Sequence, residues 1–206
     1  MPKLPFLFAF LLLAVAQFAQ ADDEFVTCYS VVKFMNANDG SRLHSHDVKY
    51  GSGSGQQSVT AVKNSDDINS HWQIFPALNS NCNRGDVIKC GDKIRLKHLT
   101  TATFLHSHHF TAPLSKNNQE VSAFGSEAES DSGDNWTVLC HGDEWVESEQ
   151  FKLRHVVTGA YLSLSGQQYG RPIHGQREVV GTDSITGGSA WKVAEGIHIK
   201  HQQKDL

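Results

Sequence analysis

Beyond its first 21 residues the chain lacks a long hydrophobic run and apolar residues at helical spacing, and the whole chain lacks an excess of basic residues. After residue 21 no apolar stretch reaches the roughly 20 residues that a transmembrane helix requires, so we expect no membrane span. Lys and Arg number 18 against 22 Asp and Glu, a formal net charge of −4. This balance argues against a nucleic-acid or anionic-membrane partner bound through charge.

Sequence signatures of catalysis are also missing. No Gly-x-Ser-x-Gly elbow precedes a helical pattern, and scattered Ser, His and Asp are common in any turn-rich β protein. The glycine-rich residues 51–55 lack the Lys-Ser/Thr and the helix that follow a phosphate-binding loop. We therefore expect no enzyme and no cofactor, and we interpret residues 51–55 as a turn that offers a contact surface.

The first 21 residues have the pattern of a secretory signal peptide. Lys3 supplies a basic start, residues 4–16 form a short apolar run, and Ala19-Gln20-Ala21 is a small-x-small cleavage site. We therefore expect the mature chain to begin at Asp22 in an oxidising compartment, where cysteines pair. The four cysteines contain no C-x-x-C spacing, so neither a thioredoxin-like redox site nor a zinc knuckle is indicated.

An internal repeat organises the rest of the chain. The tetrapeptide Leu-His-Ser-His occurs at Leu43 and again 62 residues later at Leu105, and a shift of 57 residues brings Leu105 to Leu162. The same shifts align Gln57 with Gln119 and Gln119 with Gln176. Each unit closes on a tryptophan in a strand-like setting, and these tryptophans are Trp72, Trp136 and Trp191.

Short alternation of apolar and charged residues predicts β-strands throughout, as in Ile94-Arg95-Leu96-Lys97. Three β-rich units that cannot each bury an apolar face should assemble about a common axis. We therefore predict an all-β fold, a β-trefoil of units at about 25–80, 88–141 and 146–196, followed by a tail at 199–206. A three-bladed propeller is the alternative.

The repeat also suggests how the cysteines pair. Cys28 and Cys90 precede the first strand of units one and two, while Cys82 and Cys140 follow the closing tryptophans. The first and last strands of a trefoil unit run antiparallel, which favours Cys28–Cys82 and Cys90–Cys140. A local Cys82–Cys90 loop with Cys28–Cys140 is the alternative pairing.

Five motifs make the chain resemble the stromal cell-derived factor 2 family. They are RLHSHDV (42–48), YGSGSGQQSVT (50–60), LHSHH (105–109), EVSAFG (120–125) and YGRPI (169–173). The resemblance implies that each unit is an MIR repeat, a module also found in protein O-mannosyltransferases and in inositol trisphosphate and ryanodine receptors. It further implies a lumenal β-trefoil that acts without catalysis beside a J-domain co-chaperone and the heat-shock ATPase BiP, in quality control of unfolded or misfolded clients.

The C-terminus bears on the compartment. The family usually ends in a retrieval tetrapeptide, and this chain ends Gln203-Lys204-Asp205-Leu206, without the Glu before the final Leu. We expect residence in the endoplasmic-reticulum lumen, with secretion as the alternative.

The histidines invite a metal interpretation, because residues i and i+2 of a strand share a face. Unit three has Ser163 and Ser165 in their place, so we expect no metal site and a partner surface instead. The candidate surface residues are His44, His46, Gly53, Ser54, His106, His108, His109, Trp145 and Arg171. A lectin-like module that binds mannose-modified proteins is the alternative function.

Overall fold

The computed structural model describes residues 24–201, so the predicted signal peptide and residues 202–206 of the tail lie outside the described part. Its twelve strands are β1 (Val31–Asn36), β2 (Arg42–Lys49), β3 (Gln57–Val62), β4 (Trp72–Pro76), β5 (Lys93–His98), β6 (Phe104–Thr111), β7 (Gln119–Phe124), β8 (Trp136–Leu139), β9 (Gln150–His155), β10 (Tyr161–Gln168), β11 (Arg177–Thr182) and β12 (Trp191–Ile197). Three single-turn 3-10 helices, η1 (Ile68–Ser70), η2 (Ser132–Asp134) and η3 (Gly187–Ser189), each precede the last strand of a unit.

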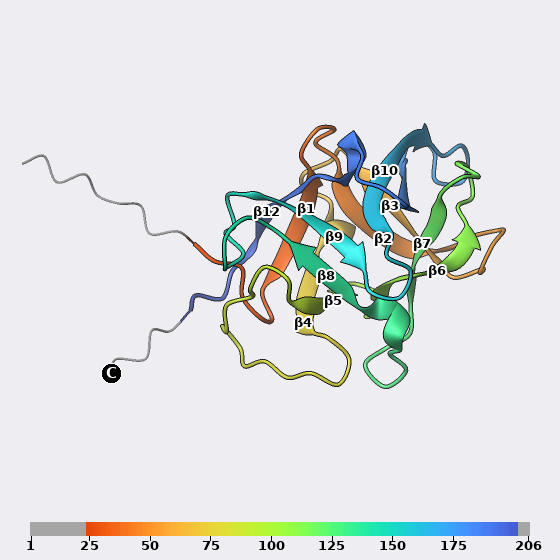
Figure 1. The fold of residues 1–206 in the computed structure, drawn as a ribbon. Helices are drawn as coiled ribbons and strands as arrows, with labels where there is room; N and C mark the ends of the chain where they lie inside the picture. Colours follow the sequence, from red (N-terminus) through yellow and green to blue (C-terminus); the bar gives the residue numbers. More distant parts are fainter. Residues whose placement is uncertain (1–23, 202–206) are drawn as a thin grey trace, which may run out of the picture.

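The strand pairing is that of a β-trefoil. The first and last strands of the units close a barrel in the order β1, β4, β5, β8, β9, β12, with β12 returning to β1, and β1 and β12 lie side by side in Figure 1. The middle strands form the hairpins β2–β3, β6–β7 and β10–β11. The third strands β3, β7 and β11 all pair with one another about the threefold axis. These pairings between units exclude a propeller, in which each blade is a separate sheet.

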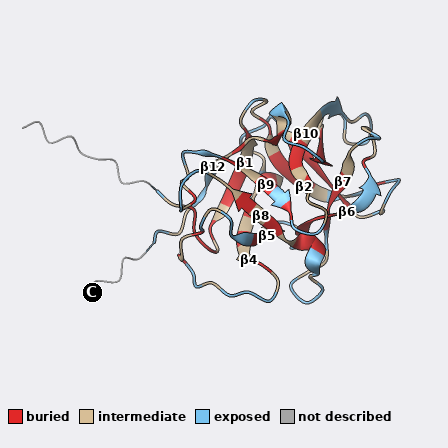
Figure 2. Ribbon diagram, in the orientation of Figure 1, coloured by how far each residue is buried: buried red, intermediate tan, exposed pale blue. Residues whose placement is uncertain are grey.

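The core repeats with the units. Trp72, Trp136 and Trp191 are fully buried. The indole Nε1 of each donates at 3.0 Å to the backbone carbonyl oxygen of the repeated leucine of its own unit, which is Leu43, Leu105 or Leu162. The strand alternation that the sequence predicts is present in β5, where Ile94 and Leu96 are buried. Figure 2 shows buried segments on the strands and exposed segments in most of the loops that join them. The prediction that the three tryptophans are core residues is therefore confirmed.

Disulfides close units one and two. Cys28 bonds to Cys82 with 6.4 Å between their Cα atoms, and Cys90 bonds to Cys140 with 5.2 Å, which is the pairing favoured by the repeat. Unit three has a polar contact in the corresponding place, where Glu147 pairs with His198 after the closing strand. Burial raises the pKa of Glu147.

The structure corrects the prediction for Trp145, which is fully buried rather than exposed. Its backbone N–H donates to Ile88 O at 2.9 Å and its carbonyl accepts from Val26 N at 2.8 Å. Isolated β-bridges join the three segments that lead into the first strands, at residues 25–27, 87–89 and 144–146, and we call these segments the connectors. The indole of Trp145 packs on Phe34 and Phe151. Val26, Ile88 and Trp145 each precede the first strand of their unit by the same number of residues. They therefore occupy equivalent places, and together they fill this end of the barrel.

A second correction concerns register in unit three. Leu43 lies opposite Ala61 and Leu105 opposite Ala123, whereas Leu162 lies opposite Gly181. The third hairpin is therefore one residue longer, and the structural counterpart of Gln119 is Arg177 rather than Gln176. This shift places a charged side chain where the other units have an amide.

Candidate functional site

A polar side chain at the end of each first strand forms a hydrogen bond to the 3-10 helix of the preceding unit, and we call these side chains the latch residues. His98 Nε2 lies 2.8 Å from the carbonyl oxygen of Asn69 in η1, and His155 Nε2 lies 2.9 Å from that of Gly133 in η2. In unit one Asn36 takes this role and donates to Gly188 O at 2.7 Å. Both imidazoles are buried, and desolvation lowers the pKa of each to about 4. They are therefore neutral structural groups at neutral pH.

The first histidine of each Leu-His-Ser-His motif is also buried, which corrects the prediction that His44 and His106 face a partner. His44 Nδ1 lies 2.8 Å from Asp67 Oδ2, and His106 Nδ1 lies 2.9 Å from Asp134 Oδ1. Burial lowers the pKa of His44 and outweighs the opposing effect of Asp67. These imidazoles hold the 3-10 helix of their own unit against its hairpin.

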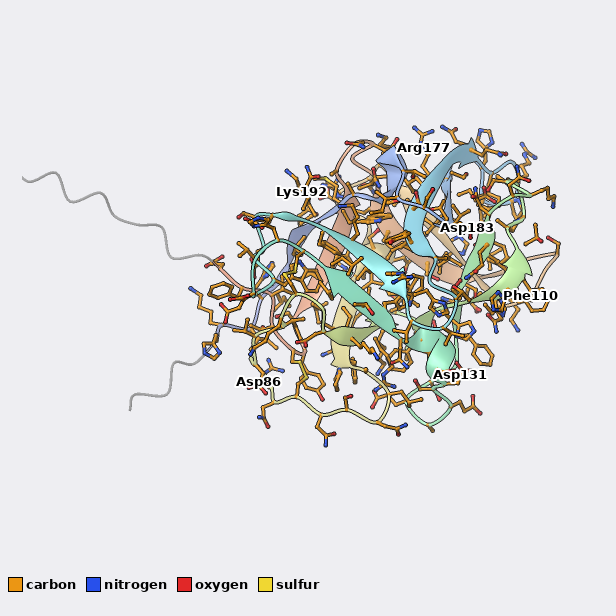
Figure 3. The ribbon with its side chains drawn as sticks, viewed as in Figure 1. Asp86, Phe110, Asp131, Arg177, Asp183 and Lys192 are labelled. Atoms are coloured by element: carbon orange, nitrogen blue, oxygen red, sulfur yellow. A yellow bond between two sulfur atoms is a disulfide. The ribbon has the colours of Figure 1, made fainter. Side chains whose placement is uncertain are left out.

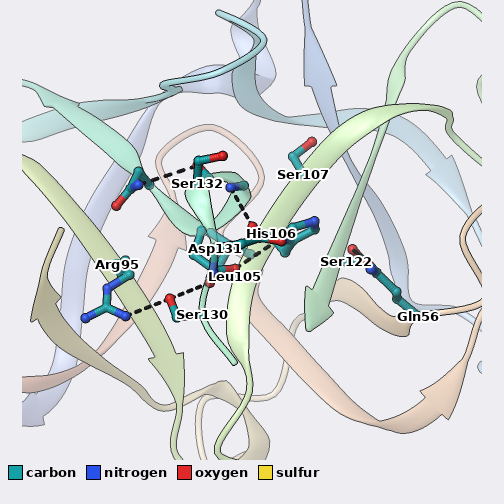
Figure 4. A network of polar contacts seen from close by, with 12 residues as sticks. Gln56, Arg95, Leu105, His106, Ser107, Ser122, Ser130, Asp131 and Ser132 are labelled. Atoms are coloured by element: carbon teal, nitrogen blue, oxygen red, sulfur yellow. Dashed lines mark hydrogen bonds and ion pairs between the residues drawn. The ribbon is translucent and has the colours of Figure 1, made fainter. Parts of the chain in front are cut away.

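Figure 4 shows the contacts around His106 and Asp131. One possible ligand atom from each of His106, Asp131 and Asp134 lies within 4.8 Å of the other two. Both carboxylates are already engaged, because they form the capping box of η2 and Asp134 Oδ2 also accepts from Ser130 Oγ at 2.7 Å. The cluster therefore serves as a helix cap.

The glycine-rich turn at residues 51–55 binds a carboxylate of its own chain. Glu120 of unit two is fully buried and accepts hydrogen bonds from the hydroxyl and the backbone N–H of Ser54, while His108 Nε2 lies 3.2 Å from it. Glu178 of unit three holds the next loop similarly and accepts from Leu114 N at 2.7 Å. A buried carboxylate needs such partners, so these loops and carboxylates fasten adjacent units.

The replacement Gly53→Ala is expected to lower the free energy of unfolding by about 1–3 kcal/mol. Gly53 has φ +67°, and a Cβ at this position would clash with the Glu120 carboxylate. Gly55→Ala is the matched control, since Gly55 has φ +69° but open space around it. Urea unfolding of both variants separates the clash from the backbone strain; equal losses would show that the Glu120 contact does not constrain the turn.

The remaining predicted surface residues fall into separate places. Ser54 and His108 meet at Glu120, and His46 Nε2 lies 3.3 Å from Gln176 Oε1, in the loop that carries the exposed Arg171. His109 and Gly53 are exposed, and Trp145 lies with the barrel connectors. The structure therefore does not gather the nine residues into one patch.

A depression that the sequence interpretation missed lies where unit three meets unit one. It has a volume of about 480 Å3 and its lining includes Asn38, Asp39, Ser165, Arg177 and Thr186. Arg177 Nη2 lies 3.2 Å from Asp39 Oδ2 across the boundary, and Figure 3 places Arg177 far from Asp86 and Asp131. The absence of histidines at Ser163 and Ser165 was the available sequence signal.

Known proteins place the chain in a family. The family profile described as MIR domain matches residues 33–144. Stromal cell-derived factor 2 of Mus musculus is 55% identical over 175 residues, which cover 85% of this chain and 82% of the relative. It is named as a factor rather than as an enzyme.

Two solved structures agree with this relationship. The SDF2-like protein from Arabidopsis thaliana is 39% identical with a TM-score of 0.84 and covers 87% of this chain and 99% of its own. A Caenorhabditis elegans protein of unknown function is 89% identical with a TM-score of 0.85, at 86% and 99% coverage. Within residues 24–201 no helix is long and apolar enough to cross a membrane. The chain belongs to the stromal cell-derived factor 2 family of MIR-domain proteins.

Proposed function

We propose that the protein is a non-catalytic accessory protein of the endoplasmic-reticulum lumen that associates with a J-domain co-chaperone and a BiP-type heat-shock ATPase. In this role it assists quality control of unfolded or misfolded proteins. The observation that carries the proposal is family membership across 85% of the chain. The signal-peptide pattern and two disulfides support an oxidising lumenal compartment.

The buried polar groups support a role without catalysis. The imidazoles of His98 and His155 hold backbone carbonyls of the preceding unit, and the carboxylate of Glu120 holds a loop. These contacts commit the groups to joining units, whereas a catalytic site requires a nucleophile and base left free to react.

Exposed apolar side chains at the boundary of units one and two suit contact with a partner or a client. Ile68 in η1 is 68% exposed and Leu99 is 50% exposed. Leu99 N donates to His71 O at 3.0 Å, which holds its turn beside the end of η1. Apolar groups that adjoin on a surface are typical of interaction sites.

Affinity purification of the tagged full-length chain from cells tests the proposal. We expect a J-domain protein and BiP to be recovered in amounts that free mannose does not reduce. The chain without residues 1–21 is the control, and its loss of entry to the lumen should abolish recovery. Elution by mannose with no chaperone recovered would overturn the proposal, and a mostly secreted product would overturn lumenal residence.

The second candidate function is lectin-like recognition of mannosyl glycans. The depression between units three and one favours it, because its lining presents both donors and acceptors from Asn38, Asp39 and Arg177. A sugar hydroxyl both donates and accepts, so it can use both kinds of group.

A further inference from the structure

We propose that the depression between units three and one is a binding site for a neutral terminal hexose, held by Asn38, Asp39 and Arg177. The inference rests on the second candidate function, sugar recognition, and assigns its place and its residues.

Smaller side chains open this boundary. The positions that line it on β10 are Leu164, Ser165 and Gly166. Ser165 and Gly166 are smaller than His46 and Asp47 at these places on β2, whereas Leu164 is larger than Ser45. Counted back from the closing tryptophan, Gly187 occupies the place of Ile68 and of Ser132. Ser165, Gly166 and Gly187 leave the depression of about 480 Å3 open on their side, and pockets of this size accept small ligands.

At the boundary of units two and three, the same space is occupied by an imidazole. A Cβ built on Gly133 would collide with the ring of His106, which shows that this ring lies directly against η2. The third unit replaces His106 by Ser163, whose hydroxyl lies 2.9 Å from Thr186 Oγ1. The shorter side chain preserves the contact with η3, and a Cβ at Gly188, the counterpart of Gly133, would meet the Leu164 carbonyl oxygen and the Ser163 hydroxyl.

The polar bridge across the boundary has also changed chemistry. Gln57 Nε2 donates to Thr101 Oγ1 at 2.8 Å, and Gln119 Nε2 donates to Thr158 Oγ1 at 2.9 Å. The third bridge joins Arg177 to Asp39 at 3.2 Å. The boundary between units three and one therefore has a charged bridge where the other two boundaries have neutral ones. The charged bridge borders the depression.

The Asp39 carboxylate is held ionised in its place. Burial raises its pKa, but hydrogen bonds from Ser41 and Lys63 and the charges of Arg177 and Lys63 outweigh burial and lower the pKa below its usual value. Asn38 is oriented as well, because its amide donates to Gly187 O and its backbone N–H donates to Asn36 Oδ1 at 3.2 Å. The polar groups are thus positioned before any ligand arrives.

This combination selects the chemistry of the ligand. Asp39 pairs with Arg177 and with Lys63, 3.3 Å away, so a cation meets two positive charges and a phosphate must compete with the Asp39 carboxylate for them. Adjacent hydroxyls of a neutral sugar can donate to the carboxylate and accept from the guanidinium at once. The open shape admits the end of a glycan chain.

The test is a titration of the 15N-labelled mature chain with methyl α-mannopyranoside, followed by amide chemical shifts. We expect changes at Asn38, Asp39 and Arg177. Gly187→Ile restores the side chain that unit one has at this position, and a Cβ there meets only Asn38 at 3.5 Å; it should weaken binding at least about tenfold. Arg177→Gln, which restores the amide of the other units, should have the same effect.

Gly170→Ile is the matched control, because Gly170 is exposed and a Cβ there meets nothing within 4 Å; it should bind as the unmodified chain does. Thermal unfolding checks that each variant is folded. Shift changes confined to the other two boundaries, unaffected by Gly187→Ile, would overturn this site while sugar recognition stands. No shift change with mannoside, glucoside or galactoside would overturn both.

Discussion

Replacing Cys90 and Cys140 together by alanine is expected to lower the free energy of unfolding by about 4 kcal/mol. The bond joins residues 50 apart in sequence, and opening a loop of this length raises the entropy of the unfolded chain by that amount. Both cysteines are only partly buried, so alanine leaves little cavity. Urea unfolding followed by tryptophan fluorescence measures the loss.

Cys28→Ala with Cys82→Ala provides the comparison. Its bond spans 54 residues, so the loss of chain entropy is nearly equal, but Cys28 is 1% exposed and packs in the core. This variant should therefore lose more, because truncating a buried side chain adds a cavity cost. A loss below about 1 kcal/mol for the Cys90 and Cys140 pair would show that the unfolded chain is already constrained without the bond.

Acidification from pH 6.5 to pH 4 is expected to remove about 3 kcal/mol of stability for each of His98 and His155. Burial lowers the pKa of both to about 4 in the folded protein, while the unfolded chain has the ordinary value of about 6.5. Between these values the unfolded state binds more protons, so the contribution is complete above pH 6.5 and falls as the pH drops. Urea unfolding at a series of pH values measures it.

Four other groups with shifted pKa values contribute less to the loss between pH 6.5 and pH 4. The lowered pKa values of Asp39 and Asp67 remove stability only below their usual value of 3.8. His44 has a lowered pKa and adds to the loss, whereas the raised pKa of Glu147 opposes it. The two latch histidines should therefore dominate the slope.

The repeat supplies the variant that isolates them. His98→Asn with His155→Asn reproduces Asn36 of unit one, which makes the same contact with a 3-10 helix without a titrating group. This variant should have a much flatter stability profile between pH 6.5 and pH 4. His109→Asn, at an exposed position, should retain the original slope. A slope unchanged in the double variant would assign the acid sensitivity to other groups.

Several positions were predictable because the same residue type recurs at equivalent places. Trp72, Trp136 and Trp191 recur at the closing strands, and each makes the same hydrogen bond to a leucine carbonyl. The cysteines of units one and two follow the same rule and pair as the antiparallel strands suggest. A residue type that recurs at equivalent positions indicates a requirement of the fold, since these positions have the same packing environment in each unit.

Positions where the units differ were predicted less well. Trp145 has no aromatic counterpart at Val26 or Ile88, so its place in the barrel plug was not apparent until the connectors were seen to meet. His44 and His106 looked suited to a surface, but their carboxylate partners follow 23 and 28 residues later and meet them only in the folded unit. Distance along the chain gave no signal for these contacts.

The threefold repeat, the all-β fold, the family and the core of tryptophans and leucines could be predicted from the amino-acid sequence, because these depend on patterns within a unit. Only the folded chain shows which histidines are buried, which carboxylate the glycine-rich turn binds, and where the depression lies. Each of these depends on residues that different segments bring together, and the Arg177 contact also depends on a one-residue lengthening of the third hairpin. A shift of one residue in strand pairing moves a side chain to the opposite face of the sheet. Only the strand register of the folded chain could therefore place the Arg177 side chain beside Asp39.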